Sequence, residues 1–300
     1  MTVQLTRNYL NSIIENSSIN DDFDVYFRLL KTHHKFIIFV SYGNDSIALI
    51  QYAHENNLKG VAIVFTDTGW SAEGWLERVE KGEKWAKSLG FKTYRTSSIG
   101  FEQLARNKKG FPTQRYQWCS YILKIEPGQR WLEDNDPECR AVCLVGVRRD
   151  ESQDRAEFPE WLINSMNHGG RVLIAPFAQL NETERNAFIE RAGWQVLPHR
   201  SRECKCINSN RADMKLFTEA DWQSIESIEN EIGKPMYRAK RHMGATGAAE
   251  VRKWANSKKG QYKSLDPENR HDLFDFEDLP PEEDLLGNSG KCGTFGGCGS

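Results

Sequence analysis

FIIFVSYGNDSIALIQYAHE, residues 36–55, decides the fold of this chain. Five apolar residues lead into a short polar turn, residues 41–46, and the turn leads into a stretch with apolar residues at helical spacing. We therefore expect a buried strand, a tight turn and a helix. The free N–H groups at the start of such a helix bind anions, but Asp45 or Ser46 would equally suit a simple helix N-cap. The stretch thus predicts either a phosphate cradle or an ordinary helix start.

The chain between residues 35 and 200 repeats this order of strand and helix. Short apolar runs rich in β-branched residues alternate with stretches of helical periodicity. The predicted strands are 35–41, 60–67, 91–96, 140–147 and 171–176, and the predicted helices between them are 45–57, 72–89 and 120–134. Such alternation favours an α/β fold with a mainly parallel sheet that helices cover on both faces. Ligands of these sheets bind beyond the carboxyl ends of the strands.

The composition gives no sign of a membrane protein or of a strongly charged one. The 40 Lys and Arg residues nearly balance the 42 Asp and Glu residues, for a net charge of −2, so nothing attracts the whole chain to nucleic acid or to a membrane surface. No apolar run approaches the roughly 18 residues of a spanning helix, and the first residues lack the pattern of a secretory signal. We expect a cytoplasmic protein without a membrane partner.

Charge is segregated near the C-terminus. Residues 234–263 carry nine Lys or Arg against one Glu, and residues 264–286 carry nine Asp or Glu against one Arg. The basic segment predicts contact with a nucleic-acid backbone, with Tyr237, Trp254 and Tyr262 available to stack on bases. The alternative is a solvated helix face or a segment that pairs with its acidic neighbour.

Four motifs, taken together, resemble those of a known family. The turn reads Ser-x-Gly-x-Asp-Ser, TDTG follows at 66–69, WCSYILKIEP stands at 118–127 and GVRRDESQDR at 146–155. Their order and spacing resemble the adenine-nucleotide α-hydrolase (PP-loop) superfamily, and within it the branch similar to phosphoadenosine-phosphosulfate reductase. The resemblance covers roughly residues 35–210. It departs at Asn44, where many relatives have a lysine, so one phosphate-binding charge is missing.

The resemblance implies a fold, a ligand and a set of site residues. The domains would be an N-terminal helical segment (1–34), a nucleotide-binding PP-loop domain (35–200) and a Cys-containing, largely helical and irregular C-terminal region (201–300). ATP and Mg²⁺ would bind at the turn. The implied nucleotide-binding residues are Ser41, Gly43, Asp45, Ser46, Asp67, Thr68 and Arg155, and the implied catalytic residues are Ser41, Asp45, Lys124 and Arg148. Arginine forks suit phosphate oxygens because they donate two parallel hydrogen bonds.

The cysteines allow three interpretations. Cys139 flanks and Cys143 lies in the apolar run RAVCLVGV (140–147), and both fit a buried core. Clustered cysteines in a reducing compartment suggest metal or redox chemistry. The resemblance to cluster-bearing relatives implies a [4Fe–4S] site, which needs four thiolates, held by Cys119, Cys204, Cys206 and a tail cysteine, Cys298 or Cys292. A structural zinc site and free or redox-active thiols remain open.

The leading functional hypothesis is an ATP pyrophosphatase that cleaves ATP to AMP and pyrophosphate. It would activate an acceptor for sulfur transfer, as in DNA-phosphorothioation systems, with DNA as a partner in preference to tRNA and a cysteine desulfurase or sulfur carrier as the sulfur source. The first alternative is a sulfonucleotide reductase that forms sulfite. Its expected tail context, Glu-Cys-Gly-x-His, is not matched by GGCGS at 296–300. The second alternative is a non-catalytic module that binds nucleotide or nucleic acid.

Overall fold

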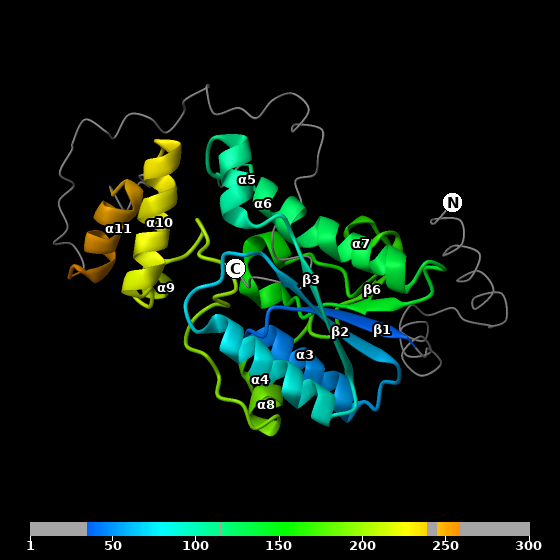
Figure 1. Ribbon diagram of the computed structural model, residues 1–300. Coiled ribbons are helices and arrows are strands. Elements are labelled where there is room, and N and C mark those ends of the chain that lie inside the picture. The colour runs from blue at the N-terminus through cyan, green and yellow to red at the C-terminus, as the bar shows by residue number, and fades with distance from the viewer. Residues whose placement is uncertain (1–34, 114–115, 239–244, 259–300) are drawn as a thin grey trace.

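A computed structural model describes residues 35–113, 116–238 and 245–258 (Figure 1). Six strands form a single sheet in the order β3-β2-β1-β4-β6-β5. The strands are β1 (Phe36–Val40), β2 (Val61–Asp67), β3 (Lys92–Ser97), β4 (Val142–Leu144), β5 (Trp161–Ser165) and β6 (Arg171–Ile174). All neighbouring pairs are parallel except β5 with β6. The predicted α/β fold with a mainly parallel sheet is confirmed.

The antiparallel strand β5 was not predicted from the sequence. It lies at the edge of the sheet and three of its five residues are exposed. An edge strand with so little burial does not need the continuous apolar run that marks the central strands, and WLINS has none.

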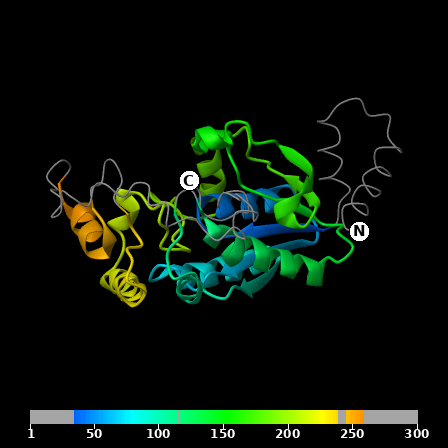
Figure 2. The same ribbon diagram turned by 90° about the horizontal axis from the view of Figure 1, so that it is seen from above.

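The sheet is covered on both faces because alternate residues of each strand point to opposite sides. Phe36, Ile38 and Val40 of β1 belong to one apolar cluster, which also contains residues of α3 (Asn44–Glu55), α4 (Trp75–Ser88) and α8 (Glu182–Arg191). Ile37 and Phe39 belong to the opposite cluster, together with Leu132 of α7 (Glu126–Asn135). Figures 1 and 2 show the two helical layers on either side of the strands.

The remaining helices form a third apolar cluster beside the sheet. They are α5 (Phe101–Lys108), α6 (Trp118–Ser120) with the π-helical turn Tyr121–Ile125, α9 (Arg211–Met214), α10 (Glu219–Ile232) and α11 (Gly247–Asn256). Trp70 and Phe101 from the first half of the chain share this cluster with Trp222 and Val251. The C-terminal region, predicted to begin at 201, therefore packs directly on the preceding part of the chain through a common core.

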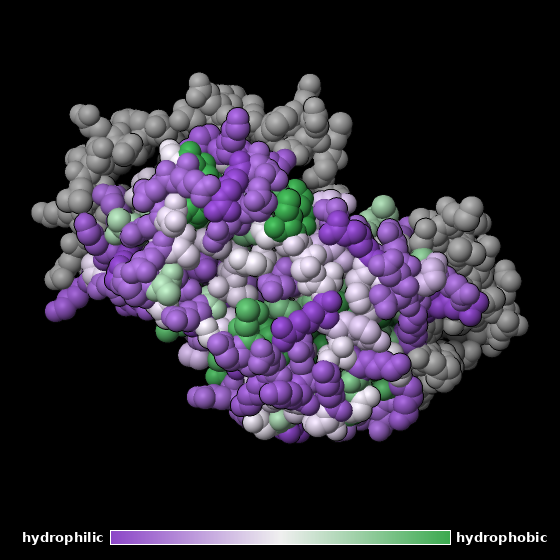
Figure 3. Space-filling view, viewed as in Figure 1, coloured by the Kyte–Doolittle hydropathy of each residue, from purple (hydrophilic) through white to green (hydrophobic). Residues whose placement is uncertain are grey.

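Capping boxes fix where the C-terminal helices begin. Asn210 at the start of α9 and Thr218 at the start of α10 each exchange hydrogen bonds with the residue three positions on. No helix within the described ranges is long and apolar enough to cross a membrane. The viewed surface is largely hydrophilic, with scattered apolar spots (Figure 3). The segment 1–34, the acidic stretch 264–286, Tyr262, Cys292 and Cys298 lie outside the described residues.

Candidate functional site

The turn after β1 is shaped by its own side chains. The Ser41 N–H donates to the Ser46 hydroxyl at 3.0 Å, and the Gly43 N–H donates to the Ser41 hydroxyl at 3.3 Å. Tyr42 is fully buried and adopts a positive φ of 59°. Gly43 is needed for space, because a Cβ there would lie 3.0 Å from the Cβ of Ser201. These contacts hold the start of α3 close to the carboxyl end of β1.

Neither Asp45 nor Ser46 caps α3, so the simpler interpretation of the turn is wrong. The N-cap is Gly43 and makes no side-chain capping bond. The two candidate caps are the second and third residues of the helix, where the Ser46 hydroxyl accepts from the Ser41 N–H and the Asp45 carboxylate accepts from basic groups. The Asp45 side chain thus faces the arginines of the cavity.

A cavity of about 420 Å³ opens over this turn. That volume lies in the range of small-molecule sites in proteins. The implied site residues that line it are Ser41, Gly43, Asp45, Ser46, Arg148 and Arg155. Its other walls come from the segment 146–151, the first turn of α8 and the segment 197–201. The motifs at 41–46 and 146–155 therefore meet, as the sequence predicted.

Three implied site residues do not line this cavity: Asp67, Thr68 and Lys124. The Asp67 carboxylate accepts a hydrogen bond from the Gly69 N–H at 2.8 Å. The Thr68 hydroxyl is buried and donates to the Glu203 carbonyl at 3.2 Å. Asp67 thus shapes the turn after β2, and Thr68 ties that turn to the C-terminal region.

Lys124 forms a buried ion pair with Glu203. The two side chains are 8% and 4% exposed, and Lys124 Nζ lies 2.5 Å from Glu203 Oε1. A buried lysine needs such a partner, because an unpaired ammonium loses its hydration without compensation. Its partner arrives from a segment 79 residues away in sequence. The role as a cation at the reacting phosphates, implied by the resemblance, therefore has no support from its position.

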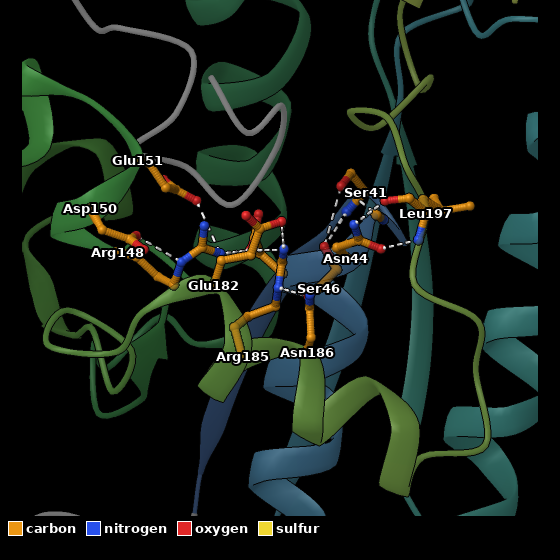
Figure 4. A network of polar contacts seen from close by, with 12 residues as sticks. Ser41, Asn44, Ser46, Arg148, Asp150, Glu151, Glu182, Arg185, Asn186 and Leu197 are labelled. Carbon is orange, nitrogen blue, oxygen red and sulfur yellow. Dashed lines mark hydrogen bonds and ion pairs between the residues drawn. The ribbon is translucent and has the colours of Figure 1, made fainter.

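Two arginines meet at Asp45 inside the cavity. Figure 4 shows the two, Arg148 and Arg185, side by side. Arg148 Nη1 and Arg185 Nη1 each lie 2.6 Å from the same oxygen, Oδ1 of Asp45. Arg148 is also held by Asp150 at 3.0 Å and by Glu151 at 3.5 Å. Arg185, on the first turn of α8, did not emerge from the sequence. The only signal was a basic residue within ETER, where the first turn of a helix favours acidic ones.

Carboxylates balance the guanidinium groups of the cavity. Arg155 pairs with Glu151, and five acidic residues line the cavity against four arginines. The acidic residues are Asp45, Asp150, Glu151, Glu182 and Asp213, and the arginines are Arg148, Arg155, Arg185 and Arg200. A polyphosphate entering the cavity therefore needs a divalent cation to bridge it to carboxylates, or must displace carboxylates from the arginines.

Asn44 uses its side chain to fix the segment that covers the turn. Its amide nitrogen donates to the Leu197 carbonyl, and its amide oxygen accepts from the Leu197 N–H, both at 2.9 Å. Farther along, the Trp70 indole donates to the Lys205 carbonyl at 3.0 Å. The segment 197–205 is thus bonded to two strand ends of the sheet, which the sequence did not indicate.

The cysteines of the described residues do not converge on a metal. Cys119, Cys204 and Cys206 are half-buried against the third apolar cluster. Within residues 35–113, 116–238 and 245–258, no group of three or more His, Cys, Asp or Glu side chains is arranged to hold a metal ion. The three thiols alone therefore do not fit an iron–sulfur or zinc site. Cys139 and Cys143 are buried, as predicted.

Comparison with known proteins identifies the same region of the chain. The profile of the phosphoadenosine phosphosulfate reductase domain matches residues 35–207. An uncharacterized protein of Methanocaldococcus jannaschii is 33% identical over 114 residues, which are 38% of this chain and only 23% of that protein.

Solved structures give weaker likenesses. The phosphoadenylyl-sulfate reductase of Candida auris, in complex with phosphate, has a TM-score of 0.41 at 16% identity, over 63% of this chain and 86% of that one. The NMN synthetase of Francisella tularensis has a TM-score of 0.40 at 12% identity, over 89% of this chain and 99% of that one.

Proposed function

Because the chain belongs to the phosphoadenosine phosphosulfate reductase domain family, within a superfamily of ATP-using enzymes, we propose that it is an ATP pyrophosphatase that adenylates an acceptor. One observation carries the proposal: the turn after β1 and the buried Arg148 line one cavity of a size suited to the phosphate end of a nucleotide. An acceptor oxygen attacks the α-phosphorus, the bond from that phosphorus to the bridging oxygen breaks, and pyrophosphate leaves with the electron pair.

Different residues of the cavity contribute to different parts of this reaction. The hydroxyls of Ser41 and Ser46 and the start of α3 hold the leaving pyrophosphate. Arg148 offsets the negative charge that develops on the phosphates as the bond breaks. Its guanidinium needs no reorganisation at that moment, because Asp150 and Glu151 already hold it.

Mg²⁺ fits the donors of this cavity. The ion is usually held by one or two carboxylates together with substrate phosphates, and Asp45 and Asp150 supply carboxylate oxygens beside the turn. When bound, it supplies charge neutralisation on the phosphates. An iron–sulfur cluster is left out of the proposed reaction, because the described cysteines do not assemble a ligand set.

Sulfur transfer to DNA is the use we propose for the adenylated product. AMP is a good leaving group. Sulfide, freed by a thiol reductant from the persulfide of a desulfurase or carrier, attacks the adenylated phosphorus; the P–S bond forms, the P–O bond to AMP breaks, and AMP leaves with the electron pair. The basic segment supports a nucleic-acid partner only in part. Arg252 is paired with Glu219, and Tyr237 and Trp254 are buried in the third apolar cluster. The predicted stacking by these two aromatic residues is therefore wrong, and Lys253 and Lys258 are the exposed cations of α11 and its end.

The test is pyrophosphate release from ATP and Mg²⁺ by anaerobically purified protein, with and without DNA or tRNA. Ser41→Ala and Asp45→Ala should abolish release, whereas Ser88→Ala, at an exposed serine of α4, should not. No release from the wild-type protein under any of these conditions would refute the proposal. Thiol-dependent sulfite formation from a sulfonucleotide would instead establish the reductase, the first alternative.

A further inference from the structure

The two arginines at Asp45 are arranged in an unusual way. Arg148 and Arg185 are 6% and 4% exposed, and they approach the same carboxylate oxygen from different walls of the cavity. Arg148 follows β4, whereas Arg185 belongs to α8 (Figure 4). Like charges this close repel each other, and each has lost most of its hydration. Arg148 has Asp150 and Glu151 as further counter-charges, whereas Asp45 is the main counter-charge of Arg185.

Arg185 has the weaker set of partners. Apart from Asp45, its guanidinium reaches the neutral Asn186 side chain at 2.8 Å and Glu182 at 3.4 Å, and Glu182 is 70% exposed. Burial lowers the pKa of Arg185, the nearby Asp45 opposes that effect and Arg148 adds to it. The charge of Arg185 is thus incompletely offset by the protein, and an anion in the cavity would complete the balance.

The turn itself offers no cation for that anion. Asn44 is neutral, and both ends of its amide are bonded to the backbone of Leu197. A positive charge that faces the turn must therefore come from another element. The first turn of α8, which packs on α3, places Arg185 there.

We propose that Arg185 is a phosphate ligand of this site and that it forms, with Arg148, a clamp of two guanidinium groups for the pyrophosphate part of the nucleotide. The identity of the occupant rests on the proposed function. Without the anion, the Asp45 carboxylate accepts hydrogen bonds from both side chains and holds them in place. When the anion binds, some of these N–H groups donate to phosphate oxygens instead. Two guanidinium forks suit this ligand because each can donate two parallel hydrogen bonds to a phosphate.

The experiment measures binding of inorganic pyrophosphate to the full chain by titration calorimetry, at fixed ionic strength and without Mg²⁺. Arg185→Met should weaken binding by at least about tenfold, the effect of losing charge-assisted hydrogen bonds. Arg191→Met is the matched control, because Arg191 lies on the same helix and pairs with Glu55 at the surface, outside the cavity. The Arg191→Met variant should bind pyrophosphate with the affinity of the wild-type protein.

Equal affinities for Arg185→Met and Arg191→Met would overturn the proposal, as would a wild-type protein that binds no pyrophosphate. Should Arg185→Met not fold, Arg185→Lys provides the readout, since it keeps the charge and removes the fork. If Arg185→Lys binds pyrophosphate several-fold more weakly than Arg191→Lys does, the clamp is supported. If the two variants bind pyrophosphate equally well, the clamp is refuted.

These results are independent of turnover. Binding that depends on Arg185, in a protein that releases no pyrophosphate from ATP, would refute the proposed reaction and leave the anion site standing. Release from ATP by the wild type, combined with an unchanged affinity in Arg185→Met, would refute the clamp alone.

Discussion

Breaking the buried ion pair between Lys124 and Glu203 should destabilise the protein far more than breaking an exposed pair of the same length. Glu203→Gln removes the carboxylate and leaves a lysine that is 8% exposed without its counter-charge. Loss of one partner of a buried pair costs about 3–5 kcal/mol of unfolding free energy. The matched control is Glu231→Gln, whose pair with Arg106 spans 2.6 Å with side chains that are 50% and 37% exposed. Because solvent screens an exposed pair, this variant should be destabilised far less than Glu203→Gln.

The assay is urea unfolding of both variants, together with the double variant Lys124→Met/Glu203→Leu. Replacing both members of a buried pair by apolar residues is often close to neutral, so the double variant should recover most of the loss. A Glu203→Gln variant that is destabilised no more than Glu231→Gln would refute the reasoning. If the double variant is stable and still releases pyrophosphate from ATP, Lys124 contributes to stability and is not needed for the reaction. If the double variant is stable but inactive, the result supports the catalytic role of Lys124 that the resemblance implies.

Three further predictions concern the turn and the core. Without Mg²⁺, Asp45→Asn should bind inorganic pyrophosphate more tightly, because the arginines lose their competing carboxylate, and weaker binding in calorimetry would contradict this. Gly82→Ala should lower the urea midpoint of unfolding, because the new Cβ would lie 2.2 Å from the Tyr42 ring. We expect this clash to outweigh the roughly 1 kcal/mol that alanine gains over glycine in helix propensity. An unchanged midpoint would argue against the clash. Burial lowers the pKa of His168 to about 3, whereas an unfolded histidine titrates near ~6.5. Between these two pKa values the unfolded chain binds a proton at this histidine that the folded chain does not. The free energy of unfolding should therefore fall by about 1.4 kcal/mol per pH unit as the pH falls from ~6.5 toward 3. His168→Gln should remove this contribution to the slope in urea titrations across that range.

The central strands and the turn were predictable because local sequence determines them. FIIFV and VAIVFTD are buried strands that need apolar residues at nearly every position. The start of α10 is likewise fixed by local sequence, through the capping box of Thr218 and Asp221. Ser41, Asp45 and Arg148 were found because they belong to motifs that can be read within a few residues.

The partners of these residues were not predictable in the same way. Arg185 lies 140 residues from Asp45, and Leu197 lies 153 residues from Asn44. No periodicity or spacing in a single sequence specifies which distant side chain completes a site. The sequence analysis could therefore name the turn and its missing charge, but not the residue that supplies a charge in its place.

Asn44 and Arg185 are two parts of one arrangement. A lysine at position 44 could not replace the paired hydrogen bonds that the amide makes with the Leu197 backbone, because lysine has no acceptor. The segment 197–205 would lose that attachment while keeping its contacts with Thr68 and Trp70. A turn that binds this covering segment through a neutral amide must therefore obtain its cation from a neighbouring element. Helix α8 packs on α3 and leads, a few residues later, into the same segment. It is thus placed both to deliver Arg185 to the cavity and to start the chain on its path over the turn.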